Sequence, residues 1–597
     1  MNMKKYISVF LIAITSLSFT SCNKLFLEAP IDKISEIDVW TNPMLLDEYM
    51  NSAYRGMSNG FDTYLFTTAL VRGADRFFYG WFTDQITVNN KLEDETIYGG
   101  IIKGLDSDLS QWARVSWQGY YSQIQSINRL FENEGNITAG EQKERILGEA
   151  HFFRAYYYYM LWRQWGGVML INNTFDPLKE DVKFARASYH EMVDAIVNDA
   201  RMAAEKLPLS YESSDAGRIT KGAALMLIAK TYMWAAGEQY QIKSKSYLGF
   251  IDDQSQAMLE KAKKAYDEFF ELGQYKLIPI AGTTEEEIKR EYRQIFLTKN
   301  SIESILEVQH NNDGNYASGF GHRLDRDAAS PYFTGTNANY TPTQNHVDEY
   351  GMREGEGESP DKNDPYKGRD YRFYANILYD GAMWNGHEMD IHYTDGTAKN
   401  NYTDGTAGVD LTKYGSSETA QVTRTGYYMA KFLDETQVID NNNTYASKQN
   451  YIIWRYAEAL LDYAEITFKL GEEGTALNYV NQIRERVHMY PLTSIKWDDI
   501  YNERRVELAF EETTYWDMLR RGEAVDKLTL SKDNPLNIMV INLDSESKEK
   551  TYKTAPLYTG KGVGTKRKFQ EKQYYLPLHW DDIRYHGVDQ NPGWTEM

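Results

Sequence analysis

The chain has 597 residues, and 86 Asp and Glu against 65 Lys and Arg give a formal charge of −21 and a pI near 5.1. This acidity argues against nucleic acid or an anionic membrane surface as the main partner, because both require a basic face. Hydrophobic residues at 42% and charged residues at 25% exclude global disorder, and a single cysteine excludes a disulfide framework or a thiolate metal cluster.

The first 21 residues have the layout of an export signal. Lys4 and Lys5 precede an apolar stretch from Ile7 to Phe19 that is too short for a comfortable membrane span. The stretch ends at Phe19-Thr-Ser-Cys22, which is similar to a bacterial lipobox with Phe in place of the usual Leu. We expect residues 1–21 to be a signal peptide and Cys22 to be lipidated, so that the lipid alone holds the mature chain at the membrane. The alternative is a secretory signal followed by an incidental free cysteine.

Apolar residues near a 3.6-residue period, with Gly or Pro stop signals, predict a mostly α-helical framework. The expected helices are residues 45–55, 109–133, 145–165, 189–207, 220–236, 259–272, 452–470, 474–487 and 498–521. Several consecutive pairs resemble tetratricopeptide-type units of about 34 residues, in which alanines let the helices approach closely. A generic helical bundle would show the same periodicity.

Residues 310–450 differ from the rest because they are rich in Gly, Asn, Asp, Thr and Tyr and have few helical runs. Tyr-Thr-Asp-Gly-Thr-Ala occurs at 393–398 and again at 402–407, and we interpret each copy as a short surface turn. We therefore expect an all-α protein with minor β-hairpins, formed as one assembly over residues 22–597. Its parts would be a helical part at 22–309, a loop-rich insertion at 310–450 and a second helical part at 451–597.

The sequence contains partial matches to catalytic and metal-binding motifs, but their spacing or flanking residues do not fit the structures that these motifs require. Gly56-x-Ser58-x-Gly60 follows a helical pattern, whereas a nucleophile elbow needs a strand before it. His387 and His392 are five residues apart, whereas a zinc-protease helix needs four. We expect no catalytic residue, no metal-binding residue and no cofactor, but Asp361, Asn363 and Asp364 leave a loose structural Ca²⁺ site open.

A series of motifs in order resembles the SusD/RagB family of surface lipoproteins from Bacteroidetes, over nearly the whole mature chain. The matching segments are 27–30, 39–54, 148–156, 165–168, 218–224, 342–350, 369–372, 455–458, 481–484, 503–511 and 590–594. One departure follows Glu511, where relatives often carry Gly, any residue and Arg before the aromatic pair. Here Glu512-Thr-Thr precede Tyr515 and Trp516.

The resemblance implies a SusD-like tetratricopeptide-type fold and a non-catalytic role. Such a protein would be anchored by lipid on the extracellular face of the outer membrane. It would bind an oligosaccharide and deliver it to a SusC-like TonB-dependent transporter, on which it acts as a lid. Two alternatives remain open: peptide capture, as in RagB-like relatives, and a surface glycoside hydrolase with two carboxylates about 5–10 Å apart.

Most charged residues of the matching motifs are expected to form ion pairs between packed helices, and their tryptophans are expected to fill the core. Residues with these structural roles are Glu149, Arg154, Glu503, Arg504, Glu507, Glu511, Trp165, Trp516 and Trp594. The ligand-binding residues should therefore lie outside these motifs.

A sugar offers an apolar face to aromatic rings and a rim of hydroxyl groups to planar polar side chains. Loop aromatics beside such polar groups are therefore the candidate site. The two best aromatic candidates are Trp81 and Trp384, in segments that match by position the ligand loops of relatives. The remaining candidates are Arg72, Asp75, Arg76, Tyr79, Tyr332 and Asn385.

Overall fold

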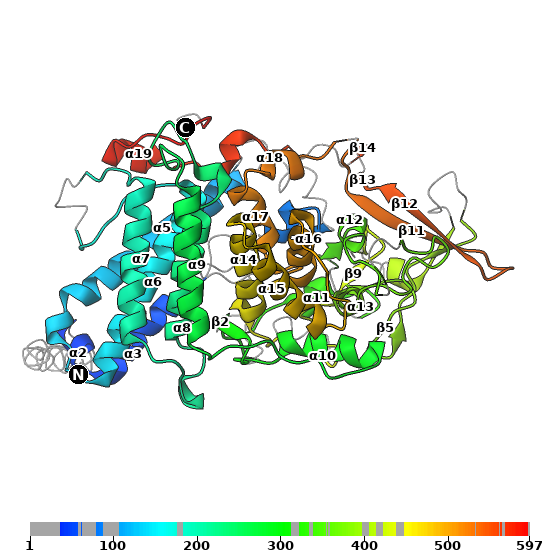
Figure 1. Cartoon of the computed structure of the whole chain (residues 1–597), viewed down its shortest axis with the longest axis horizontal. Helices are drawn as coiled ribbons and strands as arrows, with labels where there is room; N and C mark the ends of the chain where they lie inside the picture. The colour runs from blue at the N-terminus through cyan, green and yellow to red at the C-terminus, as the bar shows by residue number, and fades with distance from the viewer. Residues whose placement is uncertain are drawn as a thin grey trace, which may run out of the picture.

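A computed structural model shows the arrangement of the chain (Figure 1). It describes residues 36–57, 61, 79–87, 107–175, 183–311, 321–333, 338, 340–353, 355, 359–396, 405–412, 422–437, 447–531, 533–559, 562–563, 568–578 and 580–594. The predicted lipidation site Cys22 and the Ser58 motif residue lie outside these residues. Within the described part, no helix is both long and apolar enough to span a membrane.

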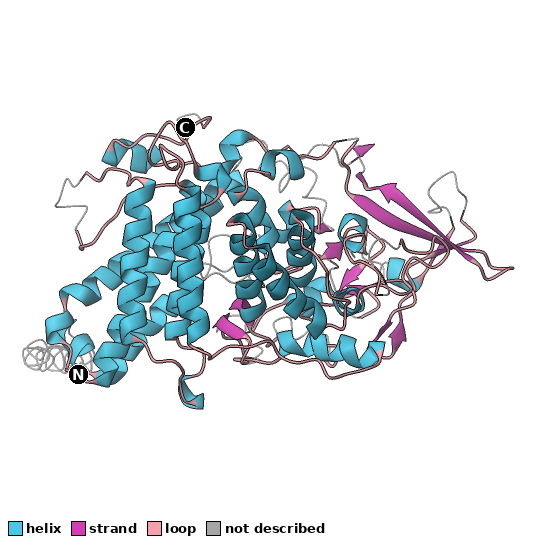
Figure 2. Cartoon of the chain, viewed as in Figure 1, coloured by secondary structure: helices cyan, strands magenta, loops and turns pink. Residues whose placement is uncertain are grey.

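Helices form most of the framework, as the secondary-structure colouring shows (Figure 2). The α-helices are α2 (Glu36–Thr41), α3 (Pro43–Tyr54), α5 (Ser107–Glu132), α6 (Glu141–Trp165), α7 (Tyr189–Lys206), α8 (Lys221–Ala235), α9 (Ser255–Glu271), α10 (Glu285–Leu297), α11 (Leu324–Ala328), α12 (Gln344–Val347), α13 (Tyr371–Asn376), α14 (Tyr456–Lys469), α15 (Glu473–Arg486), α16 (Trp497–Glu507), α17 (Thr513–Arg520), α18 (Ala524–Lys527) and α19 (Trp580–His586). The 3₁₀ helices are η1 (Tyr79–Phe82), η3 (Glu134–Asn136), η4 (Ser213–Asp215), η5 (Glu238–Tyr240), η8 (Val409–Leu411) and η9 (Glu571–Tyr574).

The longer helices form a continuous array of neighbouring pairs. Helix α6 packs on α7, α7 on α8 and α8 on α9 (Figure 1). Helix α14, from the later part of the chain, packs on α9 and on α15. Helix α8 is buried along nearly its whole length because it lies inside this array. The predicted mostly α-helical scaffold of tetratricopeptide-like pairs is confirmed.

Local sequence signals set many helix boundaries as predicted. Ser188 and Glu191 form a capping box at the start of α7, and the Thr220 hydroxyl accepts a hydrogen bond from the Ala223 N–H at the start of α8. Helix α6 ends at Gly166, whose φ of 76° lies in the left-handed region that favours glycine.

Two predicted helices were wrong in extent. Residues 452–455 belong to a strand, and α14 begins only at Tyr456. The predicted helix 498–521 is two helices, because Phe510 and Glu512 have φ values of 64° and 65° and end the helical path between α16 and α17. Periodicity alone gave no sign of these two backbone reversals.

Small sheets and loops form the end of the molecule opposite α5–α7 (Figures 1 and 2). The strands are β1 (Ile86–Thr87), β2 (Ser304–Val308), β3 (Thr341–Pro342), β4 (Ile377–Leu378), β5 (Met383–Trp384), β6 (His387–Glu388), β7 (Tyr393–Thr394), β8 (Thr406–Ala407), β9 (Tyr428–Met429), β10 (Tyr451–Arg455), β11 (Asn537–Leu543), β12 (Lys550–Pro556), β13 (Tyr558–Thr559) and β14 (Gly562–Val563). The antiparallel two-stranded pairs are β1–β3, β2–β10, β4–β9, β5–β6 and β13–β14. A hydrophobic core of its own, including Tyr350, Phe373 and Tyr428, supports these loops.

The described parts of the two repeated hexapeptides pair with each other, which the prediction of two separate surface turns did not include. Strand β7 from the first copy pairs antiparallel with β8 from the second, with Tyr393 opposite Ala407 and Thr394 opposite Thr406. Strand β7 also runs parallel to β11, so the sheet order is β12-β11-β7-β8. The repeat therefore supplies two paired strands at the edge of a sheet that the long β11–β12 hairpin completes.

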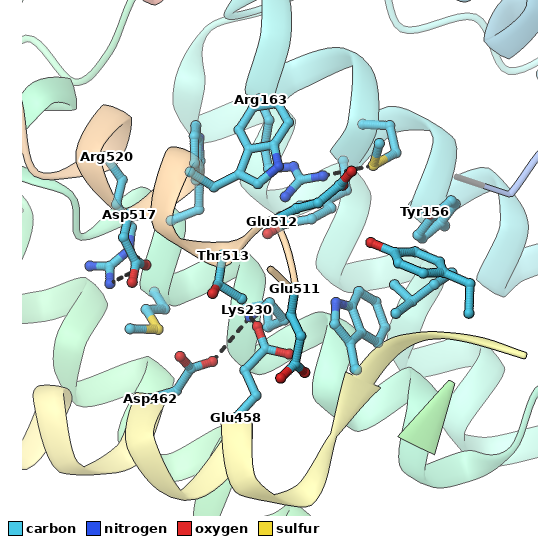
Figure 3. Close-up of a pocket in the computed structure, with 18 residues that line it drawn as sticks. Tyr156, Arg163, Lys230, Glu458, Asp462, Glu511, Glu512, Thr513, Asp517 and Arg520 are labelled. Carbon is cyan, nitrogen blue, oxygen red and sulfur yellow. Dashed lines mark hydrogen bonds and ion pairs between the residues drawn. The ribbon is translucent and has the colours of Figure 1, made fainter. Parts of the chain in front are cut away.

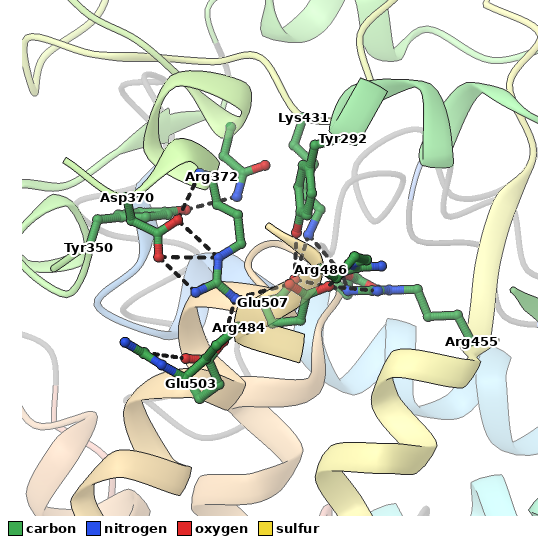
Figure 4. Close-up of polar contacts among 12 residues, drawn as sticks. Tyr292, Tyr350, Asp370, Arg372, Lys431, Arg455, Arg484, Arg486, Glu503 and Glu507 are labelled. Atoms are coloured by element: carbon green, nitrogen blue, oxygen red, sulfur yellow. Dashed lines mark hydrogen bonds and ion pairs between the residues drawn. The ribbon is translucent and has the colours of Figure 1, made fainter. Parts of the chain in front are cut away.

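Charged residues of the sequence motifs form a buried ion-pair network, as predicted (Figure 4). Arg372 Nη1 lies 3.0 Å from Glu507 Oε2, and Arg455 Nη1 lies 2.8 Å from Glu507 Oε1. Arg486 also contacts Glu507, whose side chain is fully buried. Burial alone would raise the pKa of Glu507, but Arg486, Arg455 and Arg372 outweigh it and hold the pKa well below the ordinary value.

Other charged residues of the motifs also form ion pairs. Arg154 pairs with Asp199, Arg504 pairs with Asp462 and Asp517, and Glu149 pairs with Arg145 and Arg218. Trp165 and Trp594 are buried, whereas Trp516 is half-buried under the Arg163 guanidinium at 4.2 Å. These motifs therefore hold the helices together.

The left-handed backbone of Glu512 explains why related sequences often have glycine there. Because a non-glycine residue in this region costs about 1–2 kcal/mol, we expect Glu512→Gly to raise the free energy of unfolding by about 1 kcal/mol, measured by urea denaturation. Glu260→Gly on the exposed face of α9 is the control and should lose about 1 kcal/mol. A loss in both variants would mean that the Glu512 side chain contributes more than its backbone strain costs.

Candidate functional site

A tight hairpin in the loop-rich end presents the candidate site. Strands β5 and β6 pair with Trp384 opposite His387, and Asn385-Gly386 connect them. Both connecting residues have positive φ, 46° and 75°, which is the geometry of a two-residue type I′ turn. This turn has the right-handed twist of the strands, so the hairpin holds Asn385 and His387 in fixed positions.

An exposed tyrosine ring stacks on one side chain of this hairpin, the imidazole of His387. The Tyr332 ring stacks on the His387 imidazole, with centroids 3.6 Å apart and planes 3° from parallel. Phe333 packs edge-on against Tyr332 at 5.2 Å. Tyr332 nevertheless stays 47% exposed, and the neighbouring Met383 on the hairpin is 52% exposed. We call Tyr332, Asn385 and His387 the Tyr332 platform; Met383 lies on the other face of the hairpin, opposite Glu388.

A fully buried carboxylate fixes the imidazole beneath the tyrosine. His387 Nε2 lies 2.8 Å from Asp410 Oδ2, and the same oxygen accepts the Asp390 N–H at 2.7 Å. The other oxygen of Asp410 accepts the Ser330 hydroxyl. Asp410 lies between Ser330 and His387, because each of them contacts a different oxygen of its carboxylate.

The platform has the chemistry that sugar binding needs. A flat ring with one supported face and large exposure can stack on the C–H face of a sugar. The exposed amide of Asn385 lies two residues from the stacked imidazole and offers both a donor and an acceptor. The rigid hairpin and the buried Asp410 position these groups before any ligand arrives, which reduces the entropy lost on binding.

The structure brings together two of the predicted residues, Tyr332 and Asn385. Trp384 requires a correction because it lies in a strand and not in an open loop. Its side chain is 5% exposed in the core, and Arg293 lies over its ring at 4.8 Å from the centroid. Arg293 itself pairs with Glu435 at 2.8 Å. A sugar could not stack on Trp384 without displacing this guanidinium.

The other predicted residues lie in a different part of the molecule or outside the described residues. Tyr79 and Trp81 belong to η1, which packs against α17, and only their backbone is described. Arg72, Asp75 and Arg76 lie outside the described residues. Their proposed ligand contacts therefore remain predictions.

His387 and Asp410 were missed as site residues. In the sequence, the spacing of His387 and His392 points only to metal binding, yet the two histidines have different partners, Asp410 and Asp380. The dipeptide Asn385-Gly386 between apolar and aromatic residues is a hairpin signal, and it would have placed His387 next to the turn.

Asp380, Asp390 and His392 form a group with ligand atoms within 4.8 Å of one another, in the part of the chain that the structure describes. Lys550 Nζ lies 2.5 Å from Asp380 Oδ2, and His392 Nδ1 lies 2.8 Å from Oδ1. The two oxygens of Asp380 are thus already paired, one with an ammonium group and the other with an imidazole. In the segment weighed for Ca²⁺, the Asp361 carboxylate accepts the Asn363 N–H in a turn, and ion binding there stays a prediction.

A cavity of about 80 Å³ lies between α6, α8, α14 and α17 (Figure 3). On its wall, Lys230 Nζ lies 2.5 Å from Glu458 Oε1 and 3.1 Å from Asp462 Oδ2. Burial outweighs Lys230 and raises the pKa of Glu458 to about 7, whereas Lys230 and Arg504 outweigh burial and lower that of Asp462. Two carboxyl groups of unequal pKa suit glycoside hydrolysis. Here one ammonium bridges them, so we assign this trio to helix packing.

Fold and platform together define a helix-pair scaffold that carries a loop-built aromatic surface. The family model described as SusD family matches residues 302–594, and a second, described as starch-binding associating with outer membrane, matches residues 26–233. The chain belongs to the SusD/RagB family.

The chain is similar to proteins of this family along nearly its full length. SusD-like protein P38 of Formosa agariphila is 24% identical over 88% of this chain and 93% of its own length. A solved SusD-like protein from Bacteroides fragilis is 25% identical, with a TM-score of 0.70 over 95% of this chain and 100% of that one. Surface glycan-binding protein A from Bacteroides thetaiotaomicron, solved with laminarihexaose, has a TM-score of 0.60 at 17% identity over 92% and 99% of the two chains, which shows a shared fold.

Proposed function

We propose that this protein captures an oligosaccharide or polysaccharide without cleaving it, and that the Tyr332 platform is its contact surface. The observation that carries the proposal is the exposed Tyr332 ring stacked on His387 beside Asn385. Two comparisons support it: the family description names starch binding, and a structure of the same fold was solved with a glucan oligosaccharide.

We propose further that the protein works at the outer membrane as part of an uptake system. A lipid on Cys22 would hold it on the extracellular face, and a SusC-like TonB-dependent transporter would receive the glycan from it. The family description of outer-membrane association and the lipobox-like segment support this location. Radiolabelled palmitate incorporated into wild type and not into Cys22→Ala would test the anchor, and co-purification with the transporter would test the partner.

The function is tested by native gel electrophoresis of residues 23–597 in gels that contain single polysaccharides. Retardation by at least one polysaccharide, with no release of reducing sugar, is the expected result. Binding of peptides and of no glycan, measured by calorimetry, would replace this function with peptide capture. Release of reducing sugar would replace it with hydrolysis.

Tyr332→Ala tests the platform itself. The substitution removes the stacking ring, and truncation of an aromatic anchor costs about 2 kcal/mol, so we expect affinity for the retained glycan to fall about 30-fold. Tyr332→Phe keeps the ring and should bind nearly as wild type. Tyr585→Ala removes a tyrosine on α19 that is more exposed than Tyr332, and it serves as the control. Unchanged affinity in Tyr332→Ala would place the glycan elsewhere.

A further inference from the structure

The hydrogen bonds around Asp410 determine which nitrogen of His387 carries the proton. Asp410 accepts hydrogen bonds from the Ser330 hydroxyl and the Asp390 N–H. An ionised carboxylate can only accept, so His387 must donate to it through Nε2. In the neutral imidazole the opposite nitrogen, Nδ1, then has no proton and is a hydrogen-bond acceptor.

This Nδ1 atom is available to a ligand. His387 Nε2 is used by Asp410, and no hydrogen bond is formed by Nδ1 within the described residues. The His387 side chain keeps 14% of its surface exposed, beside the exposed Tyr332 ring. It lies at the edge of the ring on which Tyr332 stacks. A sugar unit next to one stacked on Tyr332 could donate a hydroxyl hydrogen to it.

The charges near the platform are mostly negative. Asp390 and Asp410 lie within the hydrogen-bonded group of His387, whereas the exposed Glu388 lies on the other face of the hairpin, opposite Met383. The two cations described beside this hairpin are already paired: Arg293 with Glu435 at 2.8 Å, and Lys550 with Asp380 at 2.5 Å. A sulfate or carboxylate group on a ligand has no hydrogen to donate to Nδ1 and would be repelled by the carboxylates here. A hydroxyl group can donate a hydrogen bond to Nδ1.

We propose that the Tyr332 platform selects neutral glycans over sulfated and uronic-acid glycans, with His387 Nδ1 as hydroxyl acceptor and Asp410 as the positioning residue. The proposal rests on the glycan capture proposed above. Asp410 acts through His387 because its buried carboxylate sets both the orientation and the tautomer of the imidazole.

The selectivity is tested by binding residues 23–597 to an array of neutral gluco-, xylo- and manno-oligosaccharides, with alginate, polygalacturonate and carrageenan oligosaccharides as anionic members. Binding confined to neutral members is the expected result. Strongest binding to an anionic member would overturn the selectivity while leaving glycan capture intact. Binding to no glycan would overturn both proposals, and peptide titration would then identify the alternative function.

The role of Asp410 is tested by Asp410→Asn and by the ¹⁵N resonances of the histidine rings. In wild type we expect His387 in the Nε2–H form. In Asp410→Asn the neutral amide oxygen still accepts the Asp390 N–H but holds the His387 Nε2–H form less firmly than the carboxylate, so we expect part of His387 to change to the Nδ1–H form and affinity to fall by up to about tenfold. Asp194→Asn, the same change on the exposed side of α7, is the control.

His387→Phe provides a second variant if Asp410→Asn does not fold. Phenylalanine keeps the stack under Tyr332 and lacks the acceptor nitrogen, so affinity for the neutral ligand should also fall about tenfold. An Nδ1–H resonance for His387 in wild type, or wild-type affinity in His387→Phe, would overturn the proposed role of this nitrogen.

Discussion

Replacing Glu507 by Gln is expected to lower the free energy of unfolding by about 3–5 kcal/mol, the usual cost of removing one partner from a buried ion pair. Glu507 is fully buried, and Arg372, Arg455 and Arg486 all contact its carboxylate. The amide would leave the charge of these three guanidinium groups under-compensated. Urea denaturation followed by circular dichroism measures the loss.

A surface pair supplies the control for this prediction. Arg201 and Glu268 form an ion pair with exposed fractions of 38% and 31%, so Glu268→Gln should cost no more than about 1 kcal/mol. Similar losses in the two variants would contradict the structural importance of the buried network.

The same network predicts a pH dependence of stability. Because the arginines lower the folded-state pKa of Glu507, its stabilisation is fully present above the unfolded-state pKa of about 4.3 and is lost as the pH falls below that value. We expect wild-type stability to fall steeply below about pH 4.3 and Glu507→Gln to fall less steeply. Parallel pH profiles would show that Glu507 does not titrate as this contact pattern requires.

Gly167→Ala is expected to be the second most damaging substitution. A Cβ atom at this position would lie 1.8 Å from the backbone oxygen of Ala187. The backbone cannot shift freely, because the Gly167 N–H donates to the Tyr247 carbonyl at 2.6 Å and the Ala187 N–H donates to the Val168 carbonyl at 2.9 Å. We expect a loss of about 3 kcal/mol, at the upper end of overpacking effects.

Gly135→Ala is the matched control for Gly167, because nothing lies within 4 Å of a Cβ at Gly135. That variant should stay within about 0.5 kcal/mol of wild type in urea denaturation. Equal stability of the two variants would mean that the 165–168 turn can relax, and that its glycine is not required by packing.

The fold was predictable from the sequence where local signals and burial agree. Helix α7 has a capping box at its start and an apolar face along its length, and it was predicted to within one residue. Residues 498–521 were predicted poorly, because the two left-handed residues between α16 and α17 are neither Gly nor Asn. Tertiary contacts hold these two residues in the left-handed conformation, and no local sequence signal predicts it.

The candidate site was predictable only in part. Tyr332 and Asn385 were chosen as loop residues with the right chemistry, and the structure places them together although 53 positions separate them. Trp384 looked equivalent to Asn385 in sequence, but Trp384 is the last residue of β5 and packs in the core, whereas Asn385 lies in the exposed turn. The role of Asp410 depends on contacts between distant segments, which no local pattern carries.

A structure of residues 23–597 bound to an oligosaccharide from the retained polysaccharide would test the central claim most directly. The account predicts one sugar ring stacked on Tyr332, with carbon atoms about 3.5–4.0 Å from the aromatic ring, and a hydroxyl group of a neighbouring unit directed at His387 Nδ1. A sugar bound instead in the cavity beside Trp516, or against η1 with Tyr332 uncovered, would contradict it.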